Sequence, residues 1–156
     1  MIMPFFTCIL VVLSSWGVGG LVNEYLRTLS SYKSLTTMVF IKKDKLNAYL
    51  GVNLFQVLVS KSWYSKINKT INLKDYSFEG LKNMRKHIES GEMGHLIGLT
   101  LVQAYFLIQL ILEGSLSHFS LGTILNILLN LYPILLQQKN KLRIDRLLNQ
   151  YRKTDG

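Results

Sequence analysis

The chain has 156 residues, about one domain's worth, and 49% of them are hydrophobic. The formal net charge is +9 at pH 7, and the single cysteine, Cys8, excludes an internal disulfide. The apolar residues are gathered into long blocks, which predicts one membrane domain covering residues 1–156.

Three blocks are long and apolar enough to cross a membrane as helices, because a hydrocarbon core of about 30 Å takes about 20 helical residues. The predicted spans cover about residues 4–22, 95–112 and 119–136, and the only acidic, basic or histidine side chain in them is His95, at the start of the second span. A tight turn at Ser115–His118 would join the last two spans into an antiparallel hairpin. The predicted fold is an all-α integral membrane protein with three transmembrane helices.

Basic residues predict the orientation. Lys and Arg number zero before the first span, twelve in residues 23–94, zero in residues 113–118 and six after residue 136. Because cytoplasmic segments carry the Lys/Arg excess, we expect the N-terminus outside and both residues 23–94 and the tail 137–156 in the cytoplasm. The positive charge would then face anionic membrane lipids, so nucleic acid is not an expected partner.

The cytoplasmic segment carries an amphipathic stripe. Within Lys45–Lys61, apolar residues recur at spacings of three and four: Leu46, Tyr49, Leu50, Leu54, Val57 and Leu58. This pattern predicts a helix over about Leu46–Val59 lying in the membrane interface, with Trp63 and Tyr64 at headgroup level. A second surface helix is predicted over Tyr76–His87, with Ser77 as N-cap and a break at Ser90-Gly91 before the second span.

Glu92 and His95 form the first candidate site. Three residues apart on a helix, they share a face, so the carboxylate could orient the imidazole as a general base for a hydroxyl. An ionisable pair at a membrane edge is a functional-site hypothesis by default. Two other interpretations stay open: a polar cap at headgroup level, and a metal site, for which too few ligands converge, so no metal is expected.

Polar residues also gather at the end of the third span: Asn126, Asn130, Tyr132, Pro133, Gln138, Asn140 and Arg143. Asparagines within a membrane commonly bond a neighbouring helix, and Pro133 is expected to kink the third span. Arg143 could bind a phosphate or carboxylate, or act as an ordinary positive anchor. No P-loop, Gly-x-Gly-x-x-Gly, Gly-x-Ser-x-Gly or zinc-spaced cysteine motif is present, so a standard soluble enzyme is not indicated.

The order of these motifs resembles a small bacterial membrane family, the glycosyl-4,4'-diaponeurosporenoate acyltransferases of staphyloxanthin-type carotenoid synthesis. The likeness covers roughly Glu89–Leu148. The matching residues are Glu92, His95, Asn130, Tyr132, Pro133, Gln138, Asn140, Arg143, Leu147 and Leu148. The chain departs from the family pattern at Leu96, where an aromatic residue is usual.

The resemblance implies transfer of a fatty acyl group from a thioester to a hydroxyl of a glycosylated lipid or carotenoid at the cytoplasmic leaflet of a bacterial inner membrane. It assigns catalysis to His95 and Glu92, and substrate contacts to the other polar residues: Asn130, Tyr132, Gln138, Asn140 and Arg143. No bound cofactor is implied; acyl-CoA or an acyl-carrier protein would be the donor substrate. Expected partners are membrane lipids, the lipid-linked acceptor and a second copy of the chain. The alternative is a non-catalytic membrane scaffold or partner subunit.

Overall fold

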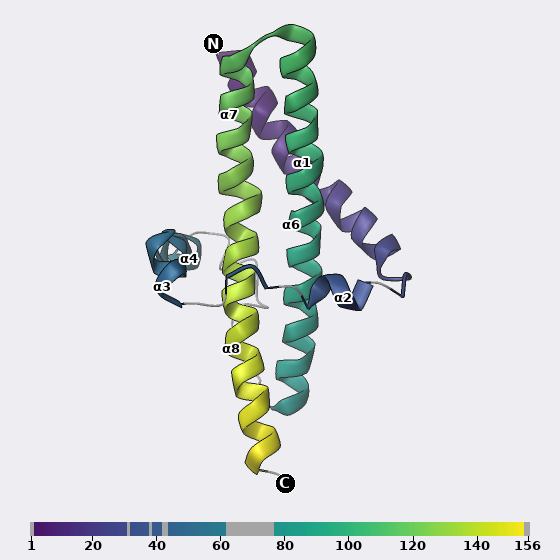
Figure 1. Ribbon diagram of the computed structural model, residues 1–156, viewed down its shortest axis with the longest axis vertical. Coiled ribbons are helices and arrows are strands. Elements are labelled where there is room, and N and C mark those ends of the chain that lie inside the picture. Colours follow the sequence, from purple (N-terminus) through teal and green to yellow (C-terminus); the bar gives the residue numbers. More distant parts are fainter. Residues whose placement is uncertain (1, 31, 38, 42–43, 62–76, 155–156) are drawn as a thin grey trace. The chain divides into compact units, whose positions relative to one another are not determined.

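A computed structural model describes residues 2–30, 32–37, 39–41, 44–61 and 77–154 (Figure 1). Every regular element in these ranges is helical, which confirms the predicted all-α class. The elements are α1 (Ile2–Leu26), α2 (Tyr32–Thr36), α3 (Asp44–Tyr49), α4 (Val52–Lys61), α6 (Phe78–Glu113), α7 (Leu116–Asn126), the π-helical segment η1 (Ile127–Leu131) and α8 (Tyr132–Thr154). Trp63 and Tyr64, predicted at headgroup level, lie outside the described residues.

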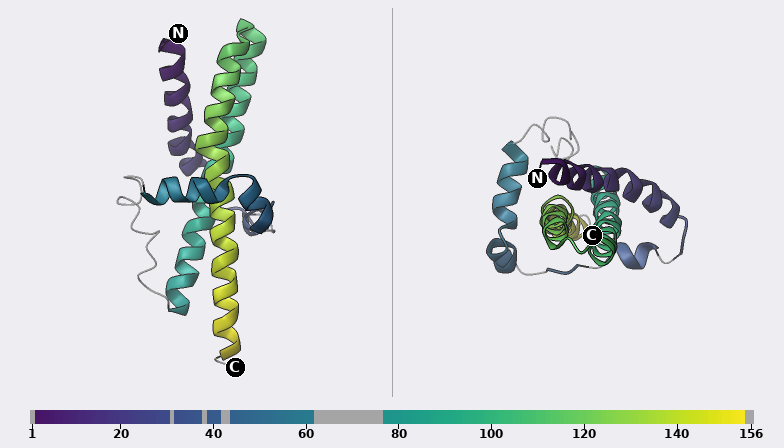
Figure 2. Two further views of the ribbon diagram at one scale, coloured as in Figure 1. Left: turned by 90° about the vertical axis from the view of Figure 1, so that its left-hand side faces the viewer. Right: turned by 90° about the horizontal axis from the view of Figure 1, so that it is seen from above.

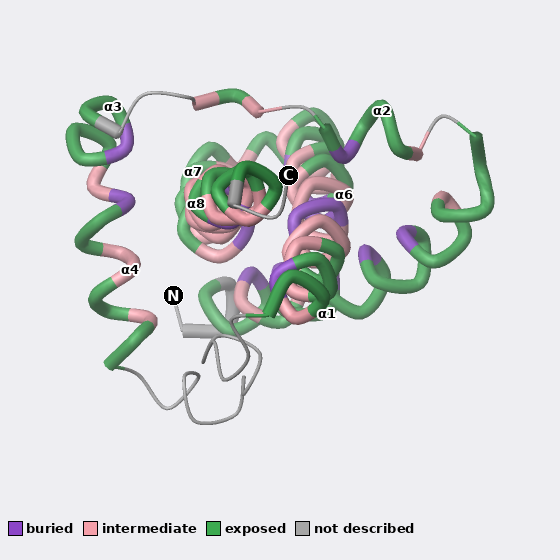
Figure 3. Tube along the Cα trace, turned by 90° about the horizontal axis from the view of Figure 1, so that it is seen from below, coloured by how far each residue is buried: buried purple, intermediate pink, exposed green. Residues whose placement is uncertain are grey.

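Three helical stretches can span a membrane, as predicted: Phe5–Leu26, a part of Phe78–Glu113 and a part of Leu116–Lys153. Their most apolar windows are only 22%, 17% and 28% buried within the protein. Figure 3 shows the resulting exposure, with most of the α1 tube in green. Helices that are apolar yet uncovered on most sides need lipid around them, so this is a multi-pass membrane protein.

The chain forms two compact units. The first contains residues 1–38 and 90–134, and the second contains residues 39–89 and 135–156. Helices α6 and α8 each contribute residues to both units. The candidate site residues are therefore divided between two units, each with its own contacts.

The first unit is held together by close packing of apolar and small residues. Its core consists of Cys8 and Val12 from α1 with Val102 and Phe106 from α6. Gly19 of α1 meets Gly94 of α6 backbone to backbone, so closely that a Cβ on Gly19 would clash with the carbonyl oxygen of Gly94. Lipid tails are as apolar as leucine side chains, so burying apolar surface gives membrane helices little reason to associate. Small residues at helix crossings stabilise the association instead, because they let the two backbones pack closely.

Helices α6 and α7 form the predicted hairpin, in which they run side by side (Figures 1 and 2). The connection is Gly114-Ser115, since α7 begins at Leu116; the predicted turn over Ser115–His118 was therefore placed too late. Gly114 has φ +67° and donates its N–H to the Leu110 carbonyl at 2.9 Å. This left-handed conformation ends α6 and suits glycine, which lacks a Cβ.

The prediction of a separate surface helix ending near His87 was wrong. Ser77 does cap the helix, as predicted: its Oγ accepts the Gly80 N–H at 3.0 Å. From there α6 continues for 36 residues through the expected break at Ser90-Gly91. Asn23 of α1 donates to Ser90 Oγ at 3.0 Å and to the Ser90 carbonyl at 3.2 Å, so tertiary contacts offset the low helix propensity of this stretch.

A π-helical turn precedes Pro133, where the sequence predicted a kink. The Tyr132 N–H donates to the Ile127 carbonyl, five residues back. Proline has no N–H and collides with the carbonyl four residues before it. The wider π turn changes the hydrogen-bond register just ahead of the proline, and the helix then continues as α8.

In the second unit, the amphipathic stripe forms two helices instead of the single predicted one. Gly51, with φ +72°, separates α3 from α4. The start of α6 is joined to α8 by an ion pair, Arg85 Nε to Asp145 Oδ1 at 2.7 Å. An edge-to-face contact between Phe78 and Tyr151, with ring centroids 6.5 Å apart, adds to this junction.

Candidate functional site

The His95 ring is held in the first unit by side chains from two other helical segments. Its Nδ1 lies 3.1 Å from Asn130 Oδ1 in η1. Trp16 of α1 packs edge-on against the imidazole, with ring centroids 5.6 Å apart and an interplanar angle of 83°. The same indole donates its Nε1–H to Asn130 Oδ1 at 3.1 Å. Three helical segments thus converge on one ring.

The contacts of Asn130 fix which nitrogen of His95 carries the proton. Tryptophan can only donate, so the Asn130 atom that faces Trp16 must be the carbonyl oxygen. The same oxygen faces His95 Nδ1, and a hydrogen bond between them requires Nδ1 to be the donor. In a neutral imidazole the other nitrogen, Nε2, then carries the lone pair and is the basic atom.

A second line of contacts gives the same orientation of Asn130. Asn126 Nδ2 donates to the Leu99 carbonyl at 3.0 Å, which leaves Asn126 Oδ1 as an acceptor. Asn130 Nδ2 donates to that oxygen at 2.9 Å and to Ser15 Oγ at 3.4 Å. With two bonds accepted and two donated, all four hydrogen-bonding positions of Asn130 are occupied by the protein.

The polar chain extends away from His95 across the helix hairpin. Asn126 Nδ2 also approaches Gln103 Oε1 at 3.4 Å, and Gln103 Nε2 donates to Thr123 Oγ1 at 3.1 Å. Asn126 and Asn130 are fully buried. Buried polar groups are costly unless each is partnered, and a fully partnered chain specifies one arrangement of the helices that carry it.

Gly98 makes room for this cluster. A Cβ at Gly98 would come within 2.9 Å of Ser15 Oγ and 3.2 Å of Asn130 Oδ1. Any larger residue would press on the two side chains that orient each other near His95. Gly98 therefore contributes to the site by leaving room for the side chains of Ser15 and Asn130.

Spacing predicted Glu92 as the hydrogen-bond partner of the imidazole, and the structure gives the Nδ1 of the ring a different partner. The side chain is buried, with 6% of its surface exposed, and the partner of His95 Nδ1 is Asn130. Sharing a helix face permits contact but does not require it. Here the ring turns to a neighbouring helical segment. Tyr132 of the same unit begins α8 directly after η1.

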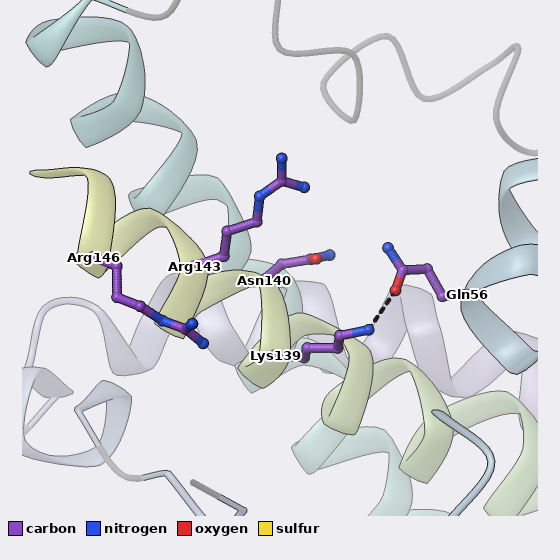
Figure 4. A pocket seen from close by; sticks show the side chains of 5 residues that line it. All are labelled: Gln56, Lys139, Asn140, Arg143 and Arg146. Atoms are coloured by element: carbon purple, nitrogen blue, oxygen red, sulfur yellow. Dashed lines mark hydrogen bonds between the residues drawn. The ribbon is translucent and has the colours of Figure 1, made fainter. Parts of the chain in front are cut away.

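The remaining predicted residues belong to the second unit. Gln138 is buried and its Oε1 accepts the Phe40 N–H at 2.9 Å. Asn140 and Arg143 line a pocket of about 340 Å³ together with Gln56, Lys139 and Arg146. Figure 4 shows four of these side chains on α8, with Gln56 coming from α4. The pocket is rich in positive charge.

Several participants were not found from the sequence. Ser15 and Trp16 sit inside the first span, which the apolar pattern marked only as an anchor, although a hydroxyl and an indole within such a span were a signal. Lys139 and Gln56 of the pocket were missed because no spacing rule connects residues 83 positions apart. In the part of the chain that the structure describes, no three His, Cys, Asp or Glu side chains gather where they could hold a metal ion.

The fold and these contacts define a small multi-pass helical membrane protein with an oriented imidazole. The family model of the glycosyl-4,4'-diaponeurosporenoate acyltransferases matches residues 28–150. The chain belongs to this family, an acyltransferase family of carotenoid biosynthesis, and the predicted resemblance is confirmed. The match includes His95 and Asn130 and begins after Ser15 and Trp16. No curated protein and no solved structure matches the chain.

Proposed function

We propose that this protein transfers a fatty acyl group from a thioester donor to a hydroxyl of a glycosylated carotenoid or related lipid, with His95 as the general base. Family membership supports the reaction class. The observation that carries the catalytic assignment is the hydrogen bond of His95 Nδ1 to Asn130, because it leaves Nε2 as the basic nitrogen.

In the proposed reaction, His95 Nε2 takes the proton of the acceptor hydroxyl as its oxygen attacks the thioester carbonyl carbon. A carbon–oxygen bond forms and the carbon–sulfur bond breaks. The sulfur leaves as a thiolate and takes the proton back from the imidazolium, which returns His95 to its neutral form. The donor would be acyl-CoA or an acyl-carrier protein, and no other reactant is needed.

Asn130 is a positioning residue in this scheme. Its four hydrogen-bonding positions are occupied within the protein, so it acts by holding the ring. This interpretation replaces the predicted substrate contact of Asn130 with an indirect role. It also moves the predicted orienting role from Glu92 to Asn130.

We further propose that the reaction takes place at the cytoplasmic leaflet. Lys and Arg are concentrated in residues 23–94 and after residue 136, which favours a cytoplasmic location for both segments. His95 follows the first of these segments at the start of the second predicted span. Thioester donors are cytoplasmic substrates, so this orientation brings the base to the side where they are available.

The test is acyl transfer in isolated membranes that contain the intact protein, His95→Gln or His87→Gln. His87 is exposed and lies on the same helix eight residues earlier, so it controls for the loss of a histidine. With glycosyl-4,4'-diaponeurosporenoate and isotope-labelled palmitoyl-CoA, mass spectrometry would detect a product heavier by one labelled acyl group.

Loss of a general base lowers a rate by roughly 100- to 10,000-fold. We expect that loss for His95→Gln at unchanged protein level, and a normal rate for His87→Gln. Equal rates for the intact protein and His95→Gln would refute the role of His95. No labelled product with palmitoyl-CoA or palmitoyl-carrier protein would favour the non-catalytic scaffold.

A further inference from the structure

The pocket on the second unit combines three cations with two amides. Lys139, Arg143 and Arg146 follow one another at spacings of four and three along α8, which places them on one helix face. Asn140 and Gln56 complete the lining, and among the residues that the structure describes no carboxylate belongs to it. Every lining side chain can donate a hydrogen bond, and three of them carry a positive charge.

Lys139 is fixed in this pocket without being neutralised. Its ammonium group donates to Asn53 Oδ1 at 2.6 Å and to Gln56 Oε1 at 2.7 Å, and both acceptors belong to α4. Figure 4 shows the bond to Gln56. Both acceptors are neutral amide oxygens, so they orient the ammonium group and leave its charge in place. The third ammonium hydrogen stays available to an anion.

The acidic residue nearest in sequence is engaged elsewhere. Asp145 lies between Arg143 and Arg146 in the chain but accepts two bonds from Arg85, at 2.7 Å from Nε and 3.3 Å from Nη2. It is not among the residues that line the pocket. Asp145 is therefore directed to Arg85 and not to the cations that line the pocket.

The geometry points to a binding site for phosphate groups in this pocket. Guanidinium groups bind phosphate oxygens through paired hydrogen bonds, and lysine adds a point charge. A volume of about 340 Å³ is in the range of small-ligand sites and exceeds what one phosphate needs. A diphosphate, such as that of a coenzyme A thioester, carries the negative charge and the acceptor oxygens that a lining of lysine, arginine and amide side chains attracts.

This inference deepens the proposed function, because the phosphate would belong to the acyl donor. The headgroup of an anionic lipid offers the same chemistry, since a basic face at a membrane attracts such lipids. The two sources differ in a measurable way. A soluble donor binds from water in a neutral bilayer, whereas a headgroup must be present in the bilayer itself.

The experiment uses the full chain in phosphatidylcholine nanodiscs and measures binding of coenzyme A, inorganic pyrophosphate and pantetheine by calorimetry. The test variant is Arg143→Gln with Arg146→Gln. The matched control is Arg152→Gln with Lys153→Gln, which removes the same charge from exposed positions on the same helix. Pantetheine, which has no phosphate, shows whether the rest of the donor site is intact.

We expect the pocket variant to weaken binding of coenzyme A and pyrophosphate by roughly 10- to 100-fold, as for loss of charge-assisted bonds. Pantetheine should bind alike in all proteins, and the control pair should change phosphate binding by no more than about threefold. In a parallel arm, native mass spectrometry counts phosphatidylglycerol retained from mixed bilayers. A selective loss in that arm alone would assign the phosphate site to a lipid headgroup.

The phosphate site is refuted if the pocket pair and the control pair behave alike in both arms. That result would leave the acyl transfer assay with His95→Gln unaffected, because His95 belongs to the first unit. Conversely, a phosphate site could bind its ligand in a protein whose His95→Gln variant keeps full activity. The two proposals therefore fail separately.

Discussion

Different kinds of contact hold the polar groups around His95 in the first unit and those at the α6–α8 junction in the second unit. The side chains that contact His95 and Asn130 in the first unit are neutral amides, hydroxyls and rings, and each hydrogen bond has a defined donor and acceptor. The α6–α8 junction of the second unit is ionic and partly exposed: the Arg85 side chain is 16% exposed and the Asp145 side chain 40%. Directed bonds between neutral groups hold the cluster around His95, whereas charge holds the junction of Arg85 and Asp145.

The difference follows from the surroundings. A membrane-spanning helix bundle offers no water to an unpaired polar group, so every donor needs a partner and a charge is costly. A set of neutral, directed bonds can then determine the tautomer of one histidine. Where water is present, charged side chains stay hydrated at little cost, and cationic side chains can bind anions. Chemistry at a fixed imidazole and recognition of a charged donor accordingly suit different parts of the chain.

The largest effect should come from cutting the neutral network at the histidine. We expect Asn130→Leu to lower kcat by about 100-fold with little change in KM, because the ring loses the acceptor that selects its Nδ1–H tautomer. The readout is the separate measurement of kcat and KM in the labelled acyl transfer assay. A change confined to KM would show that Asn130 contacts substrate instead.

Asn126→Leu is the matched control for this variant. Asn126 is equally buried and belongs to the same network, but it does not touch His95. Both variants leave buried polar groups unpartnered, at a cost of about 1–3 kcal/mol each. If kcat falls equally in the two variants, the loss reflects general stability and the positioning role is refuted.

The second effect concerns how close packing brings the network together. Gly19→Ala should lower the free energy of unfolding by about 1–3 kcal/mol, since its Cβ would meet the Gly94 carbonyl of α6. A Cβ added to Gly17 or Gly20 would meet no atom within 4 Å, so alanine there should be neutral or stabilising. Thermal unfolding in a neutral detergent, followed by circular dichroism, compares the three variants. Equal midpoints would show that α1 and α6 do not depend on this crossing.

The sequence was sufficient for the helical class and the membrane spans because both depend on local composition. Apolar blocks of about 20 residues predict a spanning helix whatever packs beside it. The pair Ser90-Gly91 misled the prediction because its structure depends on a contact from outside the local sequence. Their low helix propensity was offset by Asn23, a contact from another helix that no local pattern encodes.

The candidate site was predictable only in part. His95 and Asn130 were recognised individually, because polar residues within apolar blocks are conspicuous. Their contact was not, since it depends on the packing of η1 against α6 and on the indole of Trp16. Spacing favoured Glu92 as the partner of His95, and a tertiary contact 35 residues away supplied it instead. Pairing across helices requires the fold itself.

The smallest effect separates the ion pair of Arg85 and Asp145 from the neutral network around His95 by its response to salt. Asp145→Asn removes the charge that Arg85 faces across two bonds. Because the pair is partly exposed, we expect the free energy of unfolding to fall by roughly 0.2–1 kcal/mol.

Glu24→Gln is the control, because its pair with Arg27 is more exposed, at 65% and 41% of the two side chains, and should contribute less to the free energy of unfolding. Thermal unfolding at about 0.1 M and about 1 M salt tests the cause, since the screening length falls from about 10 Å to about 3 Å. The difference between Asp145→Asn and the intact protein should shrink at high salt, whereas the effect of Gly19→Ala should not change. A salt-independent loss for Asp145→Asn would mean that the contact between Arg85 and Asp145, like the network around His95, is held by directed bonds rather than by charge.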